Sequence, residues 1–261
     1  MKVACIQLST GENYEKNLKK ILILYKKCIS KGADFILTPE TSSIMSDDKK
    51  KLKEVIHSMN SDTLIKETKK ICLKYKKWIL IGSLVIKDRL DLKNRSVLIG
   101  PSGKVICYYD KINMFDVKIS KREIHKESTT FKSGKKIVTA KLPWGRLGLT
   151  ICYDLRFPEL YRNLSKKNLS FISVPSAFTK ITGKRHWHTL LKARAIENFC
   201  YIFAPAQTGR NTKKRETYGH TLIISPDGKI LREKKKGEGI VMTRINPKLS
   251  MKLRKIIPSF N

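Results

Sequence analysis

The sequence predicts an α/β protein with mixed β-sheets, and three observations support this class. Short apolar runs alternate along the chain with stretches whose apolar residues recur at helical spacing. Two pairs of apolar runs are joined by short turns that contain proline and glycine, so antiparallel hairpins interrupt the parallel pattern. The chain has 261 residues, a length that layered α/β folds reach as one unit, and no linker divides it. We therefore expect a single domain over residues 1–261.

Each predicted element rests on the spacing of its apolar residues and on a residue that can begin or end it. Gly32 stops the first helix, Pro39 ends the second strand, and Asp62 helps to open the second helix, whose apolar face includes Tyr75. The predicted strands are residues 3–8, 35–37, 78–86, 97–99, 105–109, 137–142, 147–152, 171–174, 201–206, 219–224, 230–233 and 240–245. The predicted helices are residues 14–28, 61–75, 157–167, 185–198 and 248–256.

The formal net charge is +33, from 55 basic and 22 acidic residues, and such a balance suits a nucleic-acid-binding protein. However, 42 of the 55 basic residues are lysine, whereas phosphate and base recognition favours the bidentate fork of arginine. The lysines also occur in pairs and triplets along the whole chain. We therefore expect a solvated lysine-rich surface and no nucleic-acid partner, with a basic nucleic-acid-binding protein as the non-enzymatic alternative.

Composition also bounds the compartment and the cofactors. No apolar run approaches the roughly 20 residues that a bilayer span needs, and the N-terminal segment is too poor in apolar residues for a signal-peptide core. We expect a cytoplasmic protein without a membrane partner. The six cysteines include no C-x-x-C pair, which argues against a disulfide framework or a zinc ribbon. His186 and His188 lack a third ligand at zinc spacing, so we expect no metal and no other cofactor.

Cys152 is a candidate nucleophile. It lies where the predicted strand 147–152 gives way to a helix, a place where a thiol is open to ligands and close to backbone N–H groups that can hold an oxyanion. Cysteine is also a common small buried hydrophobe, and spacing alone does not separate the two descriptions. A thiol nucleophile needs a base, and no histidine is an obvious partner in the sequence, although a Cys-His pair stays open. Glu40 lies just past the C-terminal end of a predicted strand, a common position for functional side chains.

Four segments of the sequence form a pattern: Leu37-Thr-Pro-Glu40 with the Thr-Ser that follows, Tyr109-Asp-Lys111-Ile-Asn-Met-Phe115, Glu127 upstream of Phe131 and Gly134, and Leu149-Thr-Ile-Cys152-Tyr153-Asp-Leu-Arg-Phe-Pro-Glu159. Together they resemble the carbon–nitrogen hydrolase (nitrilase) superfamily. They occur in the order of that family over most of the chain, and the segments Arg194-Ala-Ile-Glu and Tyr218-Gly-His220 add to the similarity. The resemblance implies a four-layer α-β-β-α sandwich with two mixed sheets, assembled as homodimers or larger even oligomers.

The catalytic set that the resemblance implies is Glu40, Lys111 and Cys152, with Glu127 as a second glutamate. Glu40 would take the thiol proton as Cys152 attacks and return it to the leaving nitrogen. Lys111 and the backbone N–H of Tyr153 would stabilise the negative oxygen of the tetrahedral intermediate. Glu127 would orient Lys111.

Within the superfamily, residues 175–220 are most similar to the deaminated glutathione amidases, with the ω-amidases as the alternative. The similarity implies cleavage of the amide between an α-ketoglutarate moiety and cysteinylglycine, the repair of a mis-transaminated metabolite. His188 stands where relatives often have glutamate. The expected substrate is a small anionic amide, and Arg210, Lys214 and Arg215 are its candidate contacts, because they lie in a polar loop. Ordinary surface charge explains these three residues equally well.

Overall fold

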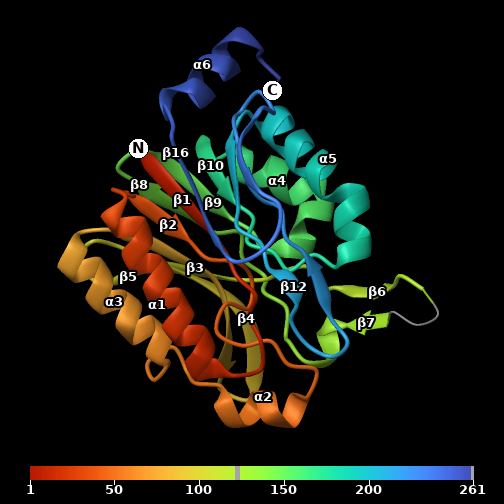
Figure 1. The fold of residues 1–261 in the computed structure, drawn as a ribbon. Coiled ribbons are helices and arrows are strands. Elements are labelled where there is room, and N and C mark those ends of the chain that lie inside the picture. The colour runs from red at the N-terminus through yellow and green to blue at the C-terminus, as the bar shows by residue number, and fades with distance from the viewer. Residues whose placement is uncertain (121–123, 260–261) are drawn as a thin grey trace.

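Strands and helices alternate along the chain, of which the structure, a computed structural model, describes residues 1–120 and 124–259 (Figure 1). The first part contains β1 (Lys2–Gln7), α1 (Tyr14–Ser30), β2 (Phe35–Leu37), α2 (Lys49–Val55), α3 (Thr63–Tyr75), β3 (Trp78–Asp88), β4 (Asp91–Ile99), β5 (Val105–Asp110), β6 (Asp116–Lys118), β7 (Ile124–Lys126) and the 3₁₀ turn η1 (Glu127–Thr129). The second part contains β8 (Thr139–Leu142), β9 (Gly145–Leu149), the 3₁₀ turn η2 (Cys152–Arg156), α4 (Pro158–Ser165), β10 (Leu169–Ser173), α5 (Lys180–Asn198), β11 (Tyr201–Ala204), β12 (Thr208–Arg210), β13 (Glu216–Tyr218), β14 (Thr221–Ile224), β15 (Ile230–Lys234), β16 (Gly239–Arg244) and α6 (Lys248–Ile256).

Two six-stranded sheets form the centre of the molecule. The strand order is β16-β1-β2-β3-β4-β5 in the first sheet and β15-β14-β11-β10-β9-β8 in the second. In each sheet three consecutive strands run parallel, β1-β2-β3 and β9-β10-β11, and the outer strands are antiparallel to their neighbours. Both sheets are therefore mixed, which confirms the predicted fold class.

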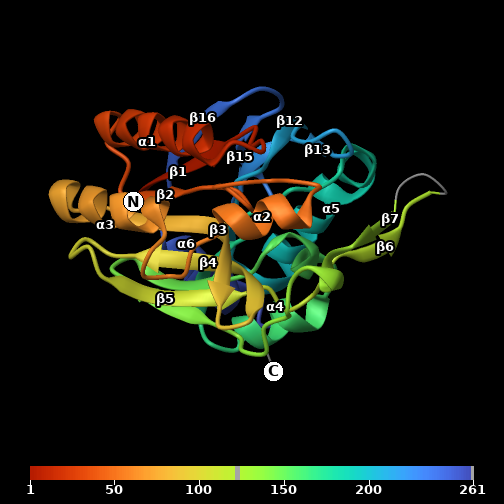
Figure 2. The same cartoon turned by 90° about the horizontal axis from the view of Figure 1, so that it is seen from below.

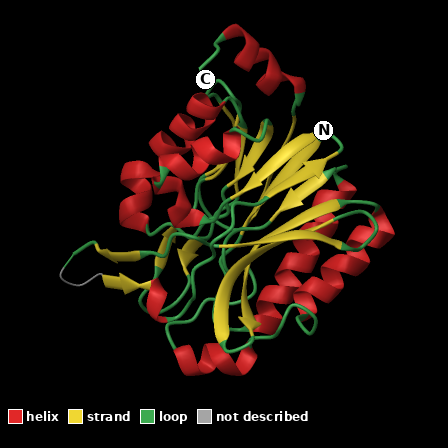
Figure 3. Cartoon of the chain, turned by 180° about the vertical axis from the view of Figure 1, so that it is seen from behind, coloured by secondary structure: helices red, strands yellow, loops and turns green. Residues whose placement is uncertain are grey.

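Helices cover the outer faces of the two sheets, so the molecule has the layer order α-β-β-α. Figures 2 and 3 show α1 and α3 on one side of the strands and α4 and α5 on the other. The α1 and α3 layer follows from sequence periodicity, because Leu18, Ile21, Tyr25 and Cys28 share one buried face of α1. Asn13 caps that helix by accepting a hydrogen bond from the backbone N–H of Lys16 at 2.9 Å.

Aromatic side chains fill the space between the two sheets. The rings of Phe35 from the first sheet and Phe203 from the second meet edge to face, with centroids 6.2 Å apart. Phe171 stacks on Phe203 at 5.5 Å, and all three residues are fully buried. This packing fixes how the sheets lie on one another, and the functional side chains of both sheets depend on that alignment.

Several elements differ from the sequence prediction. The prediction missed α2 and the hairpins β6-β7 and β12-β13, because these segments are too short or too polar to show a periodic apolar face. Helix α5 begins at Lys180 instead of residue 185, since Thr179 supplies a side-chain cap. Strand β9 ends at Leu149, and Cys152 belongs to the turn η2. Tyr75, expected on the buried face, is 37% exposed at the end of α3.

No helix among the described residues is both long and apolar enough to cross a membrane.

We predict that Phe203→Ala lowers the free energy of unfolding by about 3–5 kcal/mol, because it removes a ring from the space between the sheets. Urea unfolding followed by circular dichroism measures the change. Ile23→Ala is the control, since Ile23 is 66% exposed on α1 and its loss is expected to change stability by no more than about 0.5 kcal/mol. Equal losses for the two variants would contradict the packing described here.

Candidate active site

Glu40 enters the site from the first sheet, directly after β2. The Oγ1 of Thr38 accepts a hydrogen bond from the backbone N–H of Gly82 in β3 at 2.9 Å, and the Oγ of Ser83 accepts one from the backbone N–H of Thr41 at 2.8 Å. A Cβ atom at Gly82 would overlap the carbonyl oxygen of Thr38, so this close approach requires glycine. Strand β3 thus holds the backbone on both sides of Glu40, whose side chain is buried.

Cys152 enters the site from the second sheet, at the start of η2. Its backbone N–H donates to the carbonyl of Pro175 at 2.9 Å, and its φ of 49° is in the left-handed region, which non-glycine residues occupy at an energetic cost. The turn is locked by Asp154, whose Oδ2 accepts from the Ile151 backbone N–H at 2.9 Å and from the Tyr109 hydroxyl at 2.7 Å. Cys152 thus lies between strand β9 and helix α4, three residues beyond the end of the strand.

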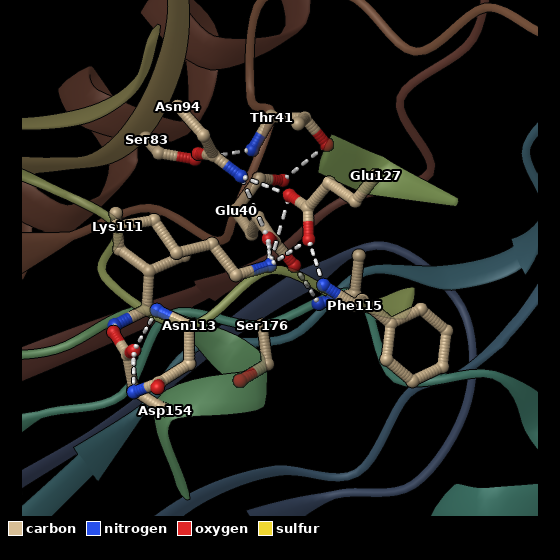
Figure 4. A network of polar contacts seen from close by, with 12 residues as sticks. Glu40, Thr41, Ser83, Asn94, Lys111, Asn113, Phe115, Glu127, Asp154 and Ser176 are labelled. Carbon is tan, nitrogen blue, oxygen red and sulfur yellow. Dashed lines mark hydrogen bonds and ion pairs between the residues drawn. The ribbon is translucent and has the colours of Figure 1, made fainter. Parts of the chain in front are cut away.

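Lys111 joins two carboxylates in the centre of the site (Figure 4). Its Nζ donates to Oε1 of Glu40 at 2.9 Å and to Oε2 of Glu127 at 2.7 Å. The lysine directly follows β5 and is only 1% exposed. Glu127 arrives after the β6-β7 hairpin, and its Oε2 also accepts from the backbone N–H of Phe115 at 2.7 Å. The Lys111 ammonium therefore connects two carboxylates, Glu40 and Glu127, that are far apart in the sequence.

Two further donors hold the carboxylates, and the sequence prediction missed both. The Nδ2 of Asn94 in β4 donates to Oε1 of Glu40 at 2.9 Å and to Oε1 of Glu127 at 3.1 Å. The backbone N–H of Ala177 donates to Oε2 of Glu40 at 2.9 Å. A polar residue inside a strand could have signalled Asn94, but the predicted strand began at residue 97. No sequence pattern marks the backbone donor of Ala177.

Burial and charge set the protonation states of the site. Burial by itself raises the pKa of Glu40, but the Lys111 and Arg215 cations and a hydrogen bond from the Cys152 thiol together hold that pKa below its usual range. Burial by itself lowers the pKa of Lys111, but the Glu127 and Glu40 carboxylates raise it overall. Burial and the negative charge of Glu40 raise the pKa of the Cys152 thiol. The resting site thus contains an ionised carboxylate, an ammonium and a neutral thiol.

A cavity of about 200 Å³ opens onto these groups. Glu40, Lys111, Glu127 and Cys152 all contribute to its wall, together with Tyr153, whose backbone N–H lies at the beginning of η2. Part of the wall is apolar, formed by Ile44, Leu52, Val85, Phe131 and Phe178, and part is charged, formed by Lys49, Lys126 and Arg215 together with Asp47. The cavity is therefore suited to a small polar molecule that reaches Cys152.

The three candidate anion contacts of the polar loop differ in whether they line the cavity. Arg215 lines the cavity, where its Nη2 donates to the carbonyl of Ala177 at 2.8 Å. Its Nε is buried without a hydrogen-bond partner among the described residues. Arg210 and Lys214 are exposed and lie outside the cavity wall, and Nη1 of Arg210 donates to the carbonyl of Lys213 at 3.2 Å. Of these three residues, Arg215 alone is placed to contact a ligand in the cavity.

The structure also bears on the Cys-His pair that the sequence left open. Glu40 is the titratable group with a hydrogen bond to the Cys152 thiol. His125 lines the cavity and lies against the ring of Phe115, with centroids 5.0 Å apart. His188 and His220 are instead grouped with Glu233, outside the cavity wall. The carboxylate therefore occupies the position that a general base requires.

The fold and site define a class of protein with two stacked mixed sheets, outer helices, and a buried cysteine, glutamate and lysine between the sheets. The family model for carbon-nitrogen hydrolases matches residues 2–255, and the chain belongs to this family.

The chain is similar to named relatives and to solved structures over most of its own length. The chain is 40% identical over 235 residues to a deaminated glutathione amidase of Yersinia enterocolitica, covering 88% of this chain and 81% of the relative. It is 36% identical over 261 residues to one of Synechocystis, covering 98% and 95%. The crystal structure of the Caenorhabditis elegans NitFhit protein matches with a TM-score of 0.92 at 31% identity, over 99% of this chain and 64% of that longer protein.

We predict that Lys111→Met lowers the free energy of unfolding by about 3–5 kcal/mol at pH 7, because it leaves the buried Glu40 carboxylate and the half-buried Glu127 carboxylate without their cation. In the wild type, the lowered pKa of Glu40 contributes stability above the unfolded-state value of about 4.3, and this contribution is lost as pH falls below that value. In the variant, a carboxylate pKa is expected to rise above the unfolded-state value, so the deficit shrinks when the pH is lowered from 7 to 5.

Urea unfolding at the two pH values measures the deficit. Lys132→Met is the matched control, since Lys132 forms a solvent-exposed ion pair with Asp91 at 2.8 Å and its removal is expected to cost less than about 1 kcal/mol. A Lys111→Met deficit that is the same at pH 5 and pH 7 would contradict the assigned charges.

Proposed function

We propose that the chain hydrolyses a small linear amide through a thioester on Cys152. The observation that carries the proposal is the arrangement of a buried thiol, an ionised Glu40 and the Lys111 ammonium around one cavity. A thiol with a raised pKa is a weak nucleophile until a base takes its proton, and Glu40 is hydrogen-bonded to it for that purpose. Membership of the carbon-nitrogen hydrolase family supports the same reaction class and argues against the nucleic-acid alternative.

In the first half of the proposed reaction, the sulfur of Cys152 attacks the amide carbonyl carbon while its proton moves to a carboxylate oxygen of Glu40. The carbonyl oxygen becomes negative and is stabilised by the Lys111 ammonium and the backbone N–H of Tyr153, a kind of donor whose removal typically costs roughly 3–4 kcal/mol of transition-state stabilisation. The carbon–nitrogen bond then breaks, Glu40 returns its proton to the leaving nitrogen, and a thioester remains.

In the second half, Glu40 takes a proton from a water molecule, whose oxygen attacks the thioester carbon. The carbon–sulfur bond breaks, the sulfur regains a proton, and the acid product leaves. Glu127 is a positioning residue in this scheme. It contacts Lys111 at 2.7 Å and is itself held by the backbone N–H of Phe115, so it fixes the direction in which the ammonium points.

The substrate that we propose is deaminated glutathione, whose hydrolysis gives α-ketoglutarate and cysteinylglycine. The relatives from Yersinia enterocolitica and Synechocystis carry the name of this activity, and the second of them matches nearly the whole chain. The cavity supports a small polyanion, because Lys49, Lys126 and Arg215 lie in its wall. We assign Arg215 to a substrate carboxylate, since it is the one of the three loop cations whose side chain lines the cavity.

We predict that Cys152→Ala abolishes amide turnover and prevents labelling of the site by iodoacetamide, because the nucleophile is gone. Glu40→Gln keeps the shape of the side chain but cannot accept a proton, so kcat is expected to fall at least ~10²-fold. Steady-state kinetics and mass spectrometry of the labelled protein measure both effects. Cys28→Ala is the control, because Cys28 lies on the buried face of α1 and its loss is expected to change stability alone. Turnover by Cys152→Ala would refute the mechanism.

We predict that Arg215→Gln raises KM for deaminated glutathione roughly 10- to 100-fold, the value of one charge-assisted hydrogen bond. The expected rise is smaller for α-ketoglutaramate, which lacks the cysteinylglycine carboxylate. Arg210→Gln and Lys214→Gln are matched controls from the same loop and should leave both KM values unchanged. Equal rises for the two substrates would assign Arg215 to the α-keto acid end that they share, and no rise would exclude it from binding.

Assembly and location stay predictions. We infer a homodimer or a larger even homo-oligomer, and the exposed apolar side chains of Ile196 on α5 and of Met251 and Ile256 on α6 support an interface on these helices. A cytoplasmic location and a single domain over residues 1–261 are likewise retained as proposals. Sedimentation velocity of the purified protein tests the assembly.

A further inference from the structure

A second cluster of side chains with metal-ligating atoms lies outside the cavity. It consists of His188 on α5, His220 just before β14, and Glu233 on β15. Their ligand atoms all lie within 4.8 Å of one another, and no other such group of three is found in residues 1–120 and 124–259. None of the three contributes to the cavity wall or to the proposed reaction. The cluster therefore needs an explanation of its own.

We propose that His188, His220 and Glu233 form a binding site for a divalent transition-metal ion such as Zn²⁺. The Nε2 of His188 and the Nδ1 of His220 both point at Oε1 of Glu233, at 3.0 and 2.5 Å. Ligand atoms about 2.0–2.2 Å from a tetrahedral ion lie roughly 3.3 Å from one another, so the two nitrogen–oxygen distances are somewhat shorter than the spacing that an ion requires. A small outward movement of each side chain would admit the ion.

The ring planes in the cluster are fixed by their neighbours. His220 stacks on Tyr218, with centroids 4.1 Å apart and an angle of 18° between the rings. The ring of His188 meets that of His220 edge to face at 5.1 Å. The carbonyl of His220 accepts a hydrogen bond from Nε1 of Trp187 at 2.8 Å, which ties its backbone to α5. Because the rings are already oriented, little conformational entropy is lost when a metal binds.

The donor set selects the class of metal. Two imidazole nitrogens and one carboxylate oxygen suit Zn²⁺, Ni²⁺, Co²⁺ or Cu²⁺, whereas Mg²⁺ and Ca²⁺ prefer oxygen ligands throughout. Three protein ligands leave a fourth position for water. All three ligands are partly accessible, with side-chain exposures of 31% for His188, 16% for His220 and 21% for Glu233, so an ion can enter from solvent.

The proposed site differs from the sequence-based expectation of no metal, which rested on the lack of a third ligand close in sequence to His186 and His188. The fold supplies two ligands from distant parts of the chain. An ion here would connect α5, the segment between β13 and β14, and β15, so we expect it to raise the thermal stability of the protein. It has no part in the proposed amide chemistry.

The test is titration of the full-length protein with Zn²⁺ by isothermal calorimetry, in the Cys152→Ser background so that the active-site thiol does not bind the metal. About 0.15 M salt screens the positive surface, because the Debye length is then roughly 8 Å. We expect one Zn²⁺ per chain, no comparable binding of Mg²⁺, and at least about tenfold weaker Zn²⁺ binding after His188→Gln or Glu233→Gln. His186→Gln, two residues from His188 and exposed, is the matched control and should bind as the background does.

Two further measurements keep the result independent of folding defects. Thermal unfolding of each metal-free variant shows whether it folds, and the visible absorption of bound Co²⁺ reports nitrogen coordination in the protein before substitution. Failure to bind Zn²⁺, or equal affinity in the background and in a folded Glu233→Gln variant, would overturn the proposal and leave the cluster as a hydrogen-bonded group. Because none of these residues touches the cavity, a failure here leaves the proposed amidase function unaffected.

Discussion

The site depends on one buried ammonium group that is shared between two carboxylates. Lys111 is held at 2.9 Å from Glu40 and at 2.7 Å from Glu127, and it is almost completely buried. Charges in such a place are tolerated only if their remaining hydrogen-bonding capacity is also satisfied. Asn94 and the backbone N–H groups of Phe115 and Ala177 meet that requirement. The rest of the fold can be understood as the means of bringing these groups together.

The same network explains why the proposed chemistry begins only with substrate. Because Lys111 and Arg215 keep Glu40 ionised while burial keeps Cys152 neutral, the proton lies on sulfur and the base stands ready beside it. Thiol deprotonation is then coupled to attack on the carbonyl, when Lys111 gains a new negative oxygen to stabilise.

The β12-β13 hairpin connects the cavity with the proposed metal site. Arg215, which lines the cavity, directly precedes β13, and Tyr218, at the end of β13, stacks on the ring of His220.

The sequence was sufficient for those parts of the molecule whose physics is local. Periodicity and a capping residue located α1 and α3, and apolar runs located the strands of both sheets, because each of these signals lies within a few neighbouring residues. Glu40 and Cys152 stood out because each follows a predicted strand, whereas Lys111 was indicated only by the family resemblance of its segment. The short hairpins and α2 were missed, since their form depends on contacts with the rest of the fold.

Tertiary structure decided which of the suggested residues meet. Asn94 lies 54 positions from Glu40, and Ala177 lies 137 positions away, so no local pattern could reveal that both hold the same carboxylate. The loop offered Arg210, Lys214 and Arg215 on equal terms, and only the path of β13 places Arg215 in the cavity. Glu233 on β15 likewise lies 3.0 Å from His188 on α5, although 45 positions separate the two residues in the sequence. A sequence fixes which face of an element is apolar, whereas the packing of sheets and helices decides which polar groups share the space between them.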